Sequence, residues 1–228
     1  MIKNIKPAII LYIIAIVITI LASYFNNDSL LLIVKPIIIP AIFFYYLQLE
    51  KFKVNWLFTL ALISIFIADM IVLFQIGDSI YTILFFNTIA YLILGYFVIS
   101  DLSLRNLGNE KIFYIVLAFI SNYLILYLVL DLIEVSNTIL FYAYLIYGLI
   151  LTTLSSFVGI NFFSKNNLRY TYASIMCGCL VLSDAFYALF NFYIKLDAFS
   201  VLNMITQFAS YYYMVKYVTS KSIKESID

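Results

Sequence analysis

The chain of 228 residues is 65% apolar or aromatic and 11% charged, and its formal net charge is +1. A soluble domain has roughly 45–50% apolar and about 25% charged residues, so this composition excludes a soluble globular protein and indicates one embedded in a lipid bilayer. The near-neutral charge argues against a nucleic-acid partner. Histidine is absent, which removes the usual ligand of a zinc hydrolase, so we expect no metal and no cofactor.

Long apolar runs follow one another along the chain. They do not alternate polar and apolar residues as membrane-barrel strands do, so the sequence predicts an all-α, polytopic integral membrane bundle. Charged and small polar residues separate about eight predicted transmembrane helices, near 7–25, 29–49, 54–75, 79–100, 111–130, 137–163, 170–193 and 198–219. The short linkers predict antiparallel neighbours and a single transmembrane domain, 1–228. The first run is long enough to span a bilayer, so we interpret it as a helix rather than a cleaved signal peptide.

Positive charges alternate between the linkers. Cytoplasmic loops carry an excess of Lys and Arg, and eleven of the thirteen such residues fall at the two chain ends or in every second linker. These eleven are Lys3, Lys6, Lys51, Lys53, Arg105, Lys111, Lys165, Arg169, Lys216, Lys221 and Lys224. Lys195 precedes the last helix, and Lys35 lies inside the second one. The alternation predicts that both termini are cytoplasmic, and the composition, rich in Ile, Asn, Lys and Tyr, favours a bacterial plasma membrane.

Three ionisable residues lie within predicted helices: Lys35, Asp69 and Asp184. Such a side chain costs about 2.5–3.5 kcal/mol on insertion scales and usually faces the bundle interior. With the predicted topology and about 1.5 Å of rise per residue, all three lie in the outer half of the bilayer, within about 5 Å of depth of each other. We therefore expect them to share one cavity.

Polar residues recur on single faces of three helices, at spacings of three, four or seven residues. They are Asn87 and Tyr91 on the fourth helix, Cys177, Asp184, Tyr187 and Asn191 on the seventh, and Asn203, Thr206, Gln207 and Ser210 on the eighth. The pattern predicts a polar, water-accessible cavity that opens away from the cytoplasm. The simpler interpretation is that Lys35 neutralises one aspartate and the other polar groups only join helices by hydrogen bonds.

Two further patterns indicate packing. The stripe formed by Tyr144, Gly148, Thr152, Ser155 and Gly159 on the sixth helix is typical of close helix contact. Tyrosines near the predicted helix ends are typical of an interfacial aromatic belt; these are Tyr45, Tyr46 and Tyr211 to Tyr213.

Four short motifs resemble the YhhN-like lysoplasmalogenase family. They are Lys35-Pro36, the segment Ser64 to Asp69, the triplet Leu182-Ser183-Asp184, and the Tyr-rich end of the eighth helix. The resemblance implies a bundle of about eight helices that cleaves the vinyl-ether bond of a lysoplasmalogen to a fatty aldehyde and a glycerophospho-alcohol. The chain departs from the family in two places: Ala68 replaces the usual glycine before the aspartate, and Asp101 stands where many members have histidine, which implies altered substrate or pH dependence, or lost activity.

In this interpretation Asp69 and Asp184 are the catalytic acid and base, and a membrane lysophospholipid is the substrate. One carboxyl, kept protonated by burial, protonates the vinyl-ether carbon, while the other stabilises the cation and activates water. Lys35 holds one aspartate ionised or contacts the phosphate. The remaining predicted substrate-binding residues are Asn87, Tyr91, Tyr187, Asn203 and Gln207.

Two other functions fit the same residues. Intramembrane carboxylates beside a lysine are also what a small proton-coupled transporter needs. Discontinuous helices are typical of transporters, and the three prolines, Pro7, Pro36 and Pro40, allow one only in the second helix. The third possibility is a catalytically silent protein that binds lipid.

Overall fold

The computed structural model of the protein describes residues 6–75, 80–102, 109–132, 138–165 and 167–225. Every regular element among these residues is helical, which confirms the predicted all-α fold. In chain order the elements are α1 (Pro7–Tyr24), α2 (Asp28–Val34), the 3₁₀ turn η1 (Lys35–Ile37), α3 (Ile38–Leu49), α4 (Trp56–Phe74), α5 (Ile80–Ser100), α6 (Asn109–Leu132), α7 (Thr138–Ser164), α8 (Leu168–Ala188), the π turn η2 (Leu189–Tyr193) and α9 (Asp197–Glu225).

The bundle is that of an integral, multi-pass membrane protein. Among the described residues, seven helical segments are long and apolar enough to cross a membrane: α1, α2 to α3, α4, α5, α6, α7, and α8 with η2. The eighth long helix, α9, is less apolar because it carries the polar stripe that faces α4 and α8. It nevertheless lies inside the bundle, where its Phe208, Met214 and Val215 are almost completely buried.

Local sequence explains where several helices begin and where one is interrupted. Side-chain oxygens of Asn27, Asn55 and Asn167 each accept a hydrogen bond from a backbone N–H two or three residues later, which caps α2, α4 and α8. Pro36 has no N–H to donate, and the second predicted helix changes there to the 3₁₀ turn η1. The π turn η2 at the end of α8 has no proline or glycine, and the sequence did not predict it.

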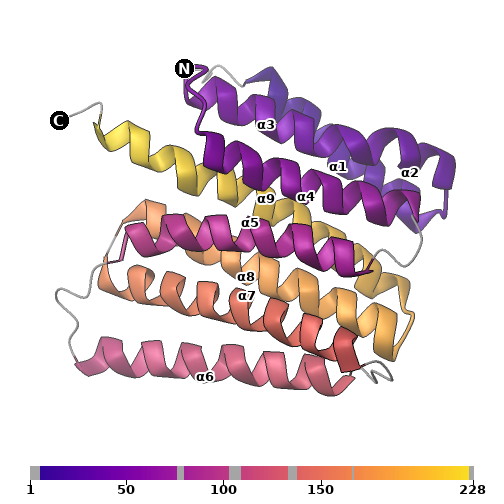
Figure 1. Ribbon diagram of the computed structural model, residues 1–228. Helices are drawn as coiled ribbons and strands as arrows, with labels where there is room; N and C mark the ends of the chain where they lie inside the picture. The colour runs from indigo at the N-terminus through magenta and orange to yellow at the C-terminus, as the bar shows by residue number, and fades with distance from the viewer. Residues whose placement is uncertain (1–5, 76–79, 103–108, 133–137, 166, 226–228) are drawn as a thin grey trace.

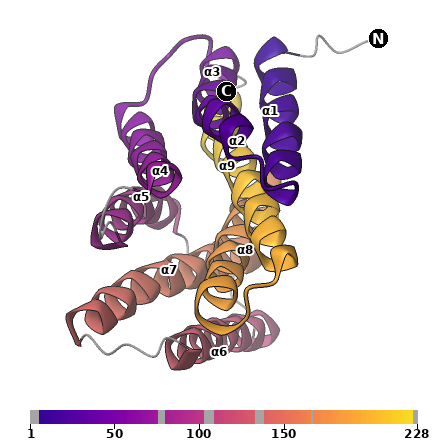
Figure 2. The ribbon, with the colours of Figure 1, turned by 90° about the vertical axis from the view of Figure 1, so that its right-hand side faces the viewer.

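The helices form one ring-like set with α6 outside it. Seen along the bundle, α1 and α3 lie against α9, α9 lies along α8, α7 joins α8 to α5, and α5 pairs with α4 (Figure 2). α5 and α7 are neighbours that run in the same direction, because α6 returns the chain along the outside of α7 (Figure 1). No residue of the α6 span Ile112–Asp131 is buried inside the protein.

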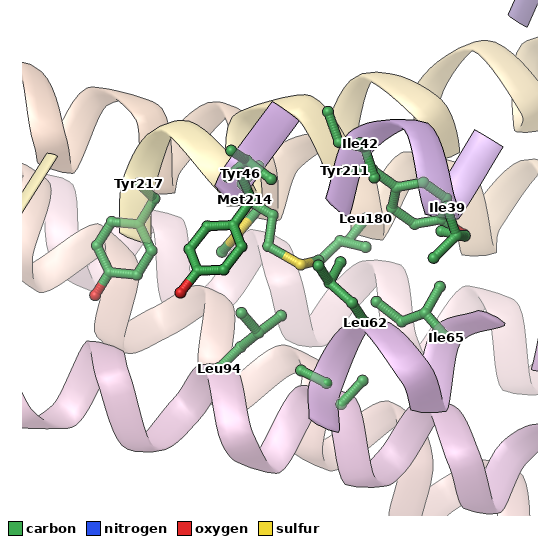
Figure 3. Close-up of a cluster of buried hydrophobic side chains, with 14 of the residues drawn as sticks. Ile39, Ile42, Tyr46, Leu62, Ile65, Leu94, Leu180, Tyr211, Met214 and Tyr217 are labelled. Atoms are coloured by element: carbon green, nitrogen blue, oxygen red, sulfur yellow. The ribbon is translucent and has the colours of Figure 1, made fainter. Parts of the chain in front are cut away.

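Aromatic and aliphatic side chains from α3, α4, α5, α8 and α9 fill the core between these helices (Figure 3). Tyr46 and Tyr211 are each 1% exposed, and Tyr45 is also buried, so the predicted interfacial role is wrong for these three. The Tyr46 hydroxyl accepts a hydrogen bond from the Asn55 N–H at 2.8 Å, which shows how a tyrosine is satisfied inside a helix bundle. Tyr212 and Tyr213 are half-buried.

The start of α1 and the end of α9 lie at the same end of the bundle (Figure 1). Lys51 and Lys53 between α3 and α4, Lys165 just after α7 and Arg169 in the first turn of α8 lie at this end too, whereas Lys195 lies at the other. Lys3 and Arg105 are outside the described residues, as are the side chains of Lys111, Lys221 and Lys224. The described cations therefore follow the predicted segregation, and the cytoplasmic assignment of this end stays a prediction.

Candidate functional site

A cavity of about 170 Å³ lies between η1 and helices α4 to α9. Its polar lining consists of Lys35, Asp69, Asn87, Asn122, Tyr144, Tyr147, Thr152, Ser183, Asp184, Tyr187, Asn203 and Gln207. Aliphatic side chains of α4 to α8 make up most of the remaining wall. The structure thus brings both predicted catalytic aspartates, Lys35 and four of the other five predicted binding residues to one cavity.

Asp69 is 7% exposed and receives hydrogen bonds on both oxygens from α9. Gln207 Nε2 donates to Oδ1 at 2.9 Å, and the Tyr211 hydroxyl donates to Oδ2 at 3.0 Å. Gln207 Nε2 also donates to the Tyr211 hydroxyl at 2.7 Å. Because Gln207 and Tyr211 are four residues apart on one helix, both reach the same carboxyl group.

Lys35 belongs to η1, is 9% exposed and lies close enough to Asp69 to act on it electrostatically. Among the described residues it forms no ion pair within 4.0 Å, so it acts on Asp69 without direct ion-pair contact, and the simpler interpretation in which it neutralises one aspartate stays open. The lysine instead places its positive charge in the wall of the cavity.

Asp184 on α8 is partly exposed to the cavity and receives both of its hydrogen bonds on one oxygen. The Tyr147 hydroxyl of α7 lies 2.6 Å from Oδ2, and the Tyr91 hydroxyl of α5 lies 3.2 Å from the same atom. The two hydroxyl oxygens are 3.1 Å apart, and the two rings are in contact. Tyr91, the remaining predicted binding residue, therefore contacts the site through Asp184 rather than through the cavity wall.

The other predicted polar positions differ in what they contact. Asn203 Nδ2 donates to the Ser183 carbonyl at 2.8 Å and to its hydroxyl at 3.0 Å, which joins α9 to α8 beside Asp184. Thr206 donates to carbonyls of its own helix, as does Ser210, and Asn191 bonds the Tyr187 carbonyl in an exposed position. These last three residues contribute no group to the cavity, although they share its stripes.

Six polar residues that line or contact the site were not predicted as part of it: Asn122, Tyr144, Tyr147, Thr152, Ser183 and Tyr211. The Tyr144 hydroxyl is buried and has no hydrogen-bond partner within the described structure. Tyr211 lies four residues after Gln207, and this spacing alone indicates that both lie on the same face of the helix. Gly148, which the sequence placed in a packing stripe, has Leu126 of α6 directly against it, so a Cβ there would lie 2.3 Å from Leu126 Cδ1.

A separate apolar groove of about 420 Å³ runs between α5 and α7. Leu92, Gly95 and Ile99 form one wall, and Leu149, Leu154 and Phe157 are among the residues of the other. The ring of Tyr91 also lines this groove, while its hydroxyl contacts Asp184. Tyr91 is therefore the residue that links the groove to the carboxylate site.

Asp101 lies far from the cavity, at the opposite end of α5 from Asn87. Its carboxylate pairs with Arg169 of α8 and accepts a hydrogen bond from the Tyr217 hydroxyl at 2.8 Å, while Lys165 donates to its backbone carbonyl. Asp101, the position at which the resemblance implied a histidine, therefore belongs to an interhelical ion pair and does not line the cavity.

Comparisons with protein-family models, with curated proteins and with solved structures find no match. Within the described residues, no group of three or more Cys, Asp or Glu side chains is placed to hold a metal ion. The groups that the structure places at the site include two carboxyl groups, a lysine, several side-chain amides and the hydroxyls of Tyr91, Tyr144, Tyr147, Tyr187 and Tyr211.

Proposed function

We propose that the protein is a membrane-embedded hydrolase that cleaves the vinyl-ether bond of a lysoplasmalogen to a fatty aldehyde and a glycerophospho-alcohol. The observation that carries the proposal is the presence of two carboxylates, Asp69 and Asp184, in the wall of one cavity within the bundle. Buried carboxyl groups are costly in a membrane and are found where proton chemistry requires them. The resemblance of the motifs around Lys35, Asp69 and Asp184 to lysoplasmalogenases supports the same activity.

Hydrolysis of a vinyl ether requires an acid, a negative charge and a base, which the two carboxyl groups can supply. Its carbon must receive a proton, the resulting oxocarbenium ion needs a nearby negative charge, and water must lose a proton as it attacks. One neutral and one ionised carboxyl meet these needs together. Lys35 adds the positive charge that a phosphate head group requires, and the amides of Asn87, Asn203 and Gln207 are available to orient water and the glycerol hydroxyls.

The surroundings also suit a lipid that has one chain. The polar cavity takes the head group, and the apolar groove between α5 and α7 takes the hydrocarbon chain. The vinyl-ether bond joins these two parts of the molecule, and Tyr91, which lines the groove, hydrogen-bonds Asp184, which lines the cavity. A substrate bound in this way would have its scissile bond near Asp184.

The direct test is to incubate the purified protein in detergent with a lysoplasmalogen and to measure the free fatty aldehyde. We expect aldehyde release that depends on protein concentration, together with an equal amount of the glycerophospho-alcohol. The matched lysophospholipid with a saturated ether bond serves as the control substrate, because it has no double bond to protonate. Absence of aldehyde under conditions in which the protein stays monodisperse would refute the proposal.

The chain-binding groove makes a prediction of its own. Gly95→Leu is expected to lower kcat/KM about tenfold for a long-chain substrate and to leave a short-chain one unchanged, because the new side chain occupies the groove. A Cβ at position 95 meets no neighbouring heavy atom within 4 Å, so a side chain there starts in open space. Gly159→Leu on α7 is the matched control, since Gly159 has the same free space but does not line the groove. An equal loss for all chain lengths would contradict this role.

A proton-coupled carrier is the second candidate, and one observation favours it. The helix of Lys35 is interrupted by a 3₁₀ turn at the cavity, and interrupted helices are typical of transporter sites. Proton flux in liposomes that depends on an added solute, without aldehyde release, would establish the carrier. Aldehyde release without flux would establish the enzyme. Stoichiometric binding of a lysoplasmalogen with neither result would identify a silent lipid-binding protein.

A further inference from the structure

The hydrogen bonds of Asp69 indicate that its carboxyl group is ionised. Gln207 has two N–H hydrogens, of which one goes to Asp69 Oδ1 and the other to the Tyr211 hydroxyl, and the Tyr211 hydrogen goes to Asp69 Oδ2. Every hydrogen of this cluster thus has an acceptor without any hydrogen on Asp69. A proton on either oxygen would face a donor. Lys35 of η1 is a cationic neighbour of Asp69, and Tyr12 of α1 and Tyr211 of α9 are titratable groups that interact with it.

The hydrogen bonds of Asp184 are arranged in a different way. Both tyrosine hydroxyls approach Oδ2, and within the described structure no donor reaches Oδ1. The titratable groups that face this carboxyl are Tyr91 of α5, Tyr147 of α7 and Tyr187 of its own helix, and none of them is a cation. Among the described residues, an ion placed there has no cation within 4.0 Å, whereas a neutral carboxylic acid keeps its hydroxyl on Oδ1 and accepts two hydrogen bonds on the carbonyl oxygen Oδ2.

We infer that Asp184 is the general acid, protonated on Oδ1, and that Asp69 is the ionised carboxylate that stabilises the oxocarbenium ion and activates water. Tyr91 and Tyr147 are positioning residues, which hold Oδ2 so that Oδ1 faces the cavity. The catalytic roles rest on the proposed function, but the two protonation states rest on the hydrogen bonds alone. Two carboxyl groups in unlike surroundings are the usual basis for such a division of roles.

The reaction balances with these assignments. Asp184 gives its proton to the vinyl carbon distal to the oxygen, forming a C–H bond, and the double bond becomes the C–O double bond of an oxocarbenium ion. Water attacks the cationic carbon and loses a proton to Asp69, which gives a hemiacetal. The hemiacetal hydroxyl then returns a proton to Asp184 as the bond to the glycerol oxygen breaks, and Asp69 gives its proton to that oxygen. One water is consumed, and both carboxyls regain their initial states.

Infrared spectroscopy tests the protonation states without requiring activity. At neutral pH, in a detergent free of esters, we expect the C=O stretch of one protonated carboxyl that shifts on transfer to D₂O. The band should persist in Asp69→Asn, disappear in Asp184→Asn, and move in frequency in Tyr147→Phe, which removes a hydrogen bond from Oδ2. Asp184→Glu, which keeps a titratable carboxyl, should retain a shifted band and guards against loss of the band through misfolding. A band that disappears in Asp69→Asn, or no such band in the wild type, would overturn the assignment.

The pH dependence of kcat/KM tests the catalytic roles. The wild type is expected to lose activity at high pH, where Asp184 ionises, and at low pH, where Asp69 is protonated. The residual activity of Asp69→Asn should lack the acidic limb, and that of Asp184→Asn should lack the alkaline limb; the reverse result would overturn the roles. If the infrared band belongs to Asp184 but the wild type releases no aldehyde, the proposed function fails and the protonation states stand.

Discussion

Replacing either aspartate of the cavity by asparagine is expected to lower kcat for vinyl-ether hydrolysis by about 10²–10⁴-fold, the usual contribution of a general acid or base. Asparagine keeps the shape of the side chain, and at position 69 its NH₂ group faces Gln207 or Tyr211, which now donate to Asp69. A variant that stays folded therefore reports the missing proton transfer. For Asp184→Asn the missing step is protonation of carbon. For Asp69→Asn the missing contributions are the countercharge to the oxocarbenium ion and the activation of water. Single-turnover aldehyde release by each purified variant measures the effect.

Two further variants complete this experiment: the double variant of the cavity and a variant of a carboxylate outside it. Because the two groups act in one reaction sequence, the Asp69→Asn/Asp184→Asn variant should be little slower than the slower single variant. Asp197→Asn, which changes an exposed carboxylate at the start of α9, should hydrolyse the substrate at the wild-type rate. Wild-type hydrolysis by either single cavity variant would refute the carboxylate mechanism.

The ion pair between Asp101 and Arg169 is expected to have the largest effect on stability. Their side chains are 8% and 11% exposed, and Asp101 Oδ2 lies 2.5 Å from a terminal guanidinium nitrogen. Removing one partner leaves a buried charge without its counter-ion, which costs about 3–5 kcal/mol. We therefore expect Asp101→Ala to lower the free energy of unfolding by this amount. The loss is greater than that of an exposed pair because the Tyr217 hydroxyl of α9 also donates a hydrogen bond to the Asp101 carboxylate.

Thermal and denaturant unfolding in detergent measure this loss. The combined Asp101→Leu/Arg169→Met variant is expected to recover much of the stability, because it removes both charges and fills the space with apolar atoms. Arg169 Nε is buried without a hydrogen-bond partner in the described structure, which favours such a recovery. Asp197→Asn is again the control. A wild-type unfolding midpoint for Asp101→Ala would show that the pair contributes no net stability.

The sequence predicted the fold well because the membrane restricts the choice of structure. Long apolar runs permit only helices, and the observed α5 and α7 (Ile80–Ser100 and Thr138–Ser164) begin and end within one residue of the ranges predicted for them. The cavity was predictable for a related reason: polar side chains such as Asp69, Asp184 and Gln207 are too costly to face lipid, so helical periodicity alone brings them together.

The tyrosines were not predictable in the same way. A tyrosine in an apolar helix fits the membrane interface, the core or a polar site equally well, so Tyr147 gave no signal and Tyr211 was assigned to the interface. The role of Asp101 depends on Arg169, which lies on another helix, and no local pattern indicates that pairing. The sequence also did not predict that α6 lies at the periphery, because the composition of α6 resembles that of the more buried helices.

The long sequence separation within the Asp69 cluster has a consequence for how the protein is made. Gln207 and Tyr211 follow Asp69 by 138 and 142 residues, so α9 emerges long after α4 during synthesis. Asp69 therefore enters the bilayer well before these two hydrogen-bond donors are made, while Lys35, one membrane span earlier, is already there. A nascent chain arrested before α9 lacks both donors to this intramembrane carboxylate.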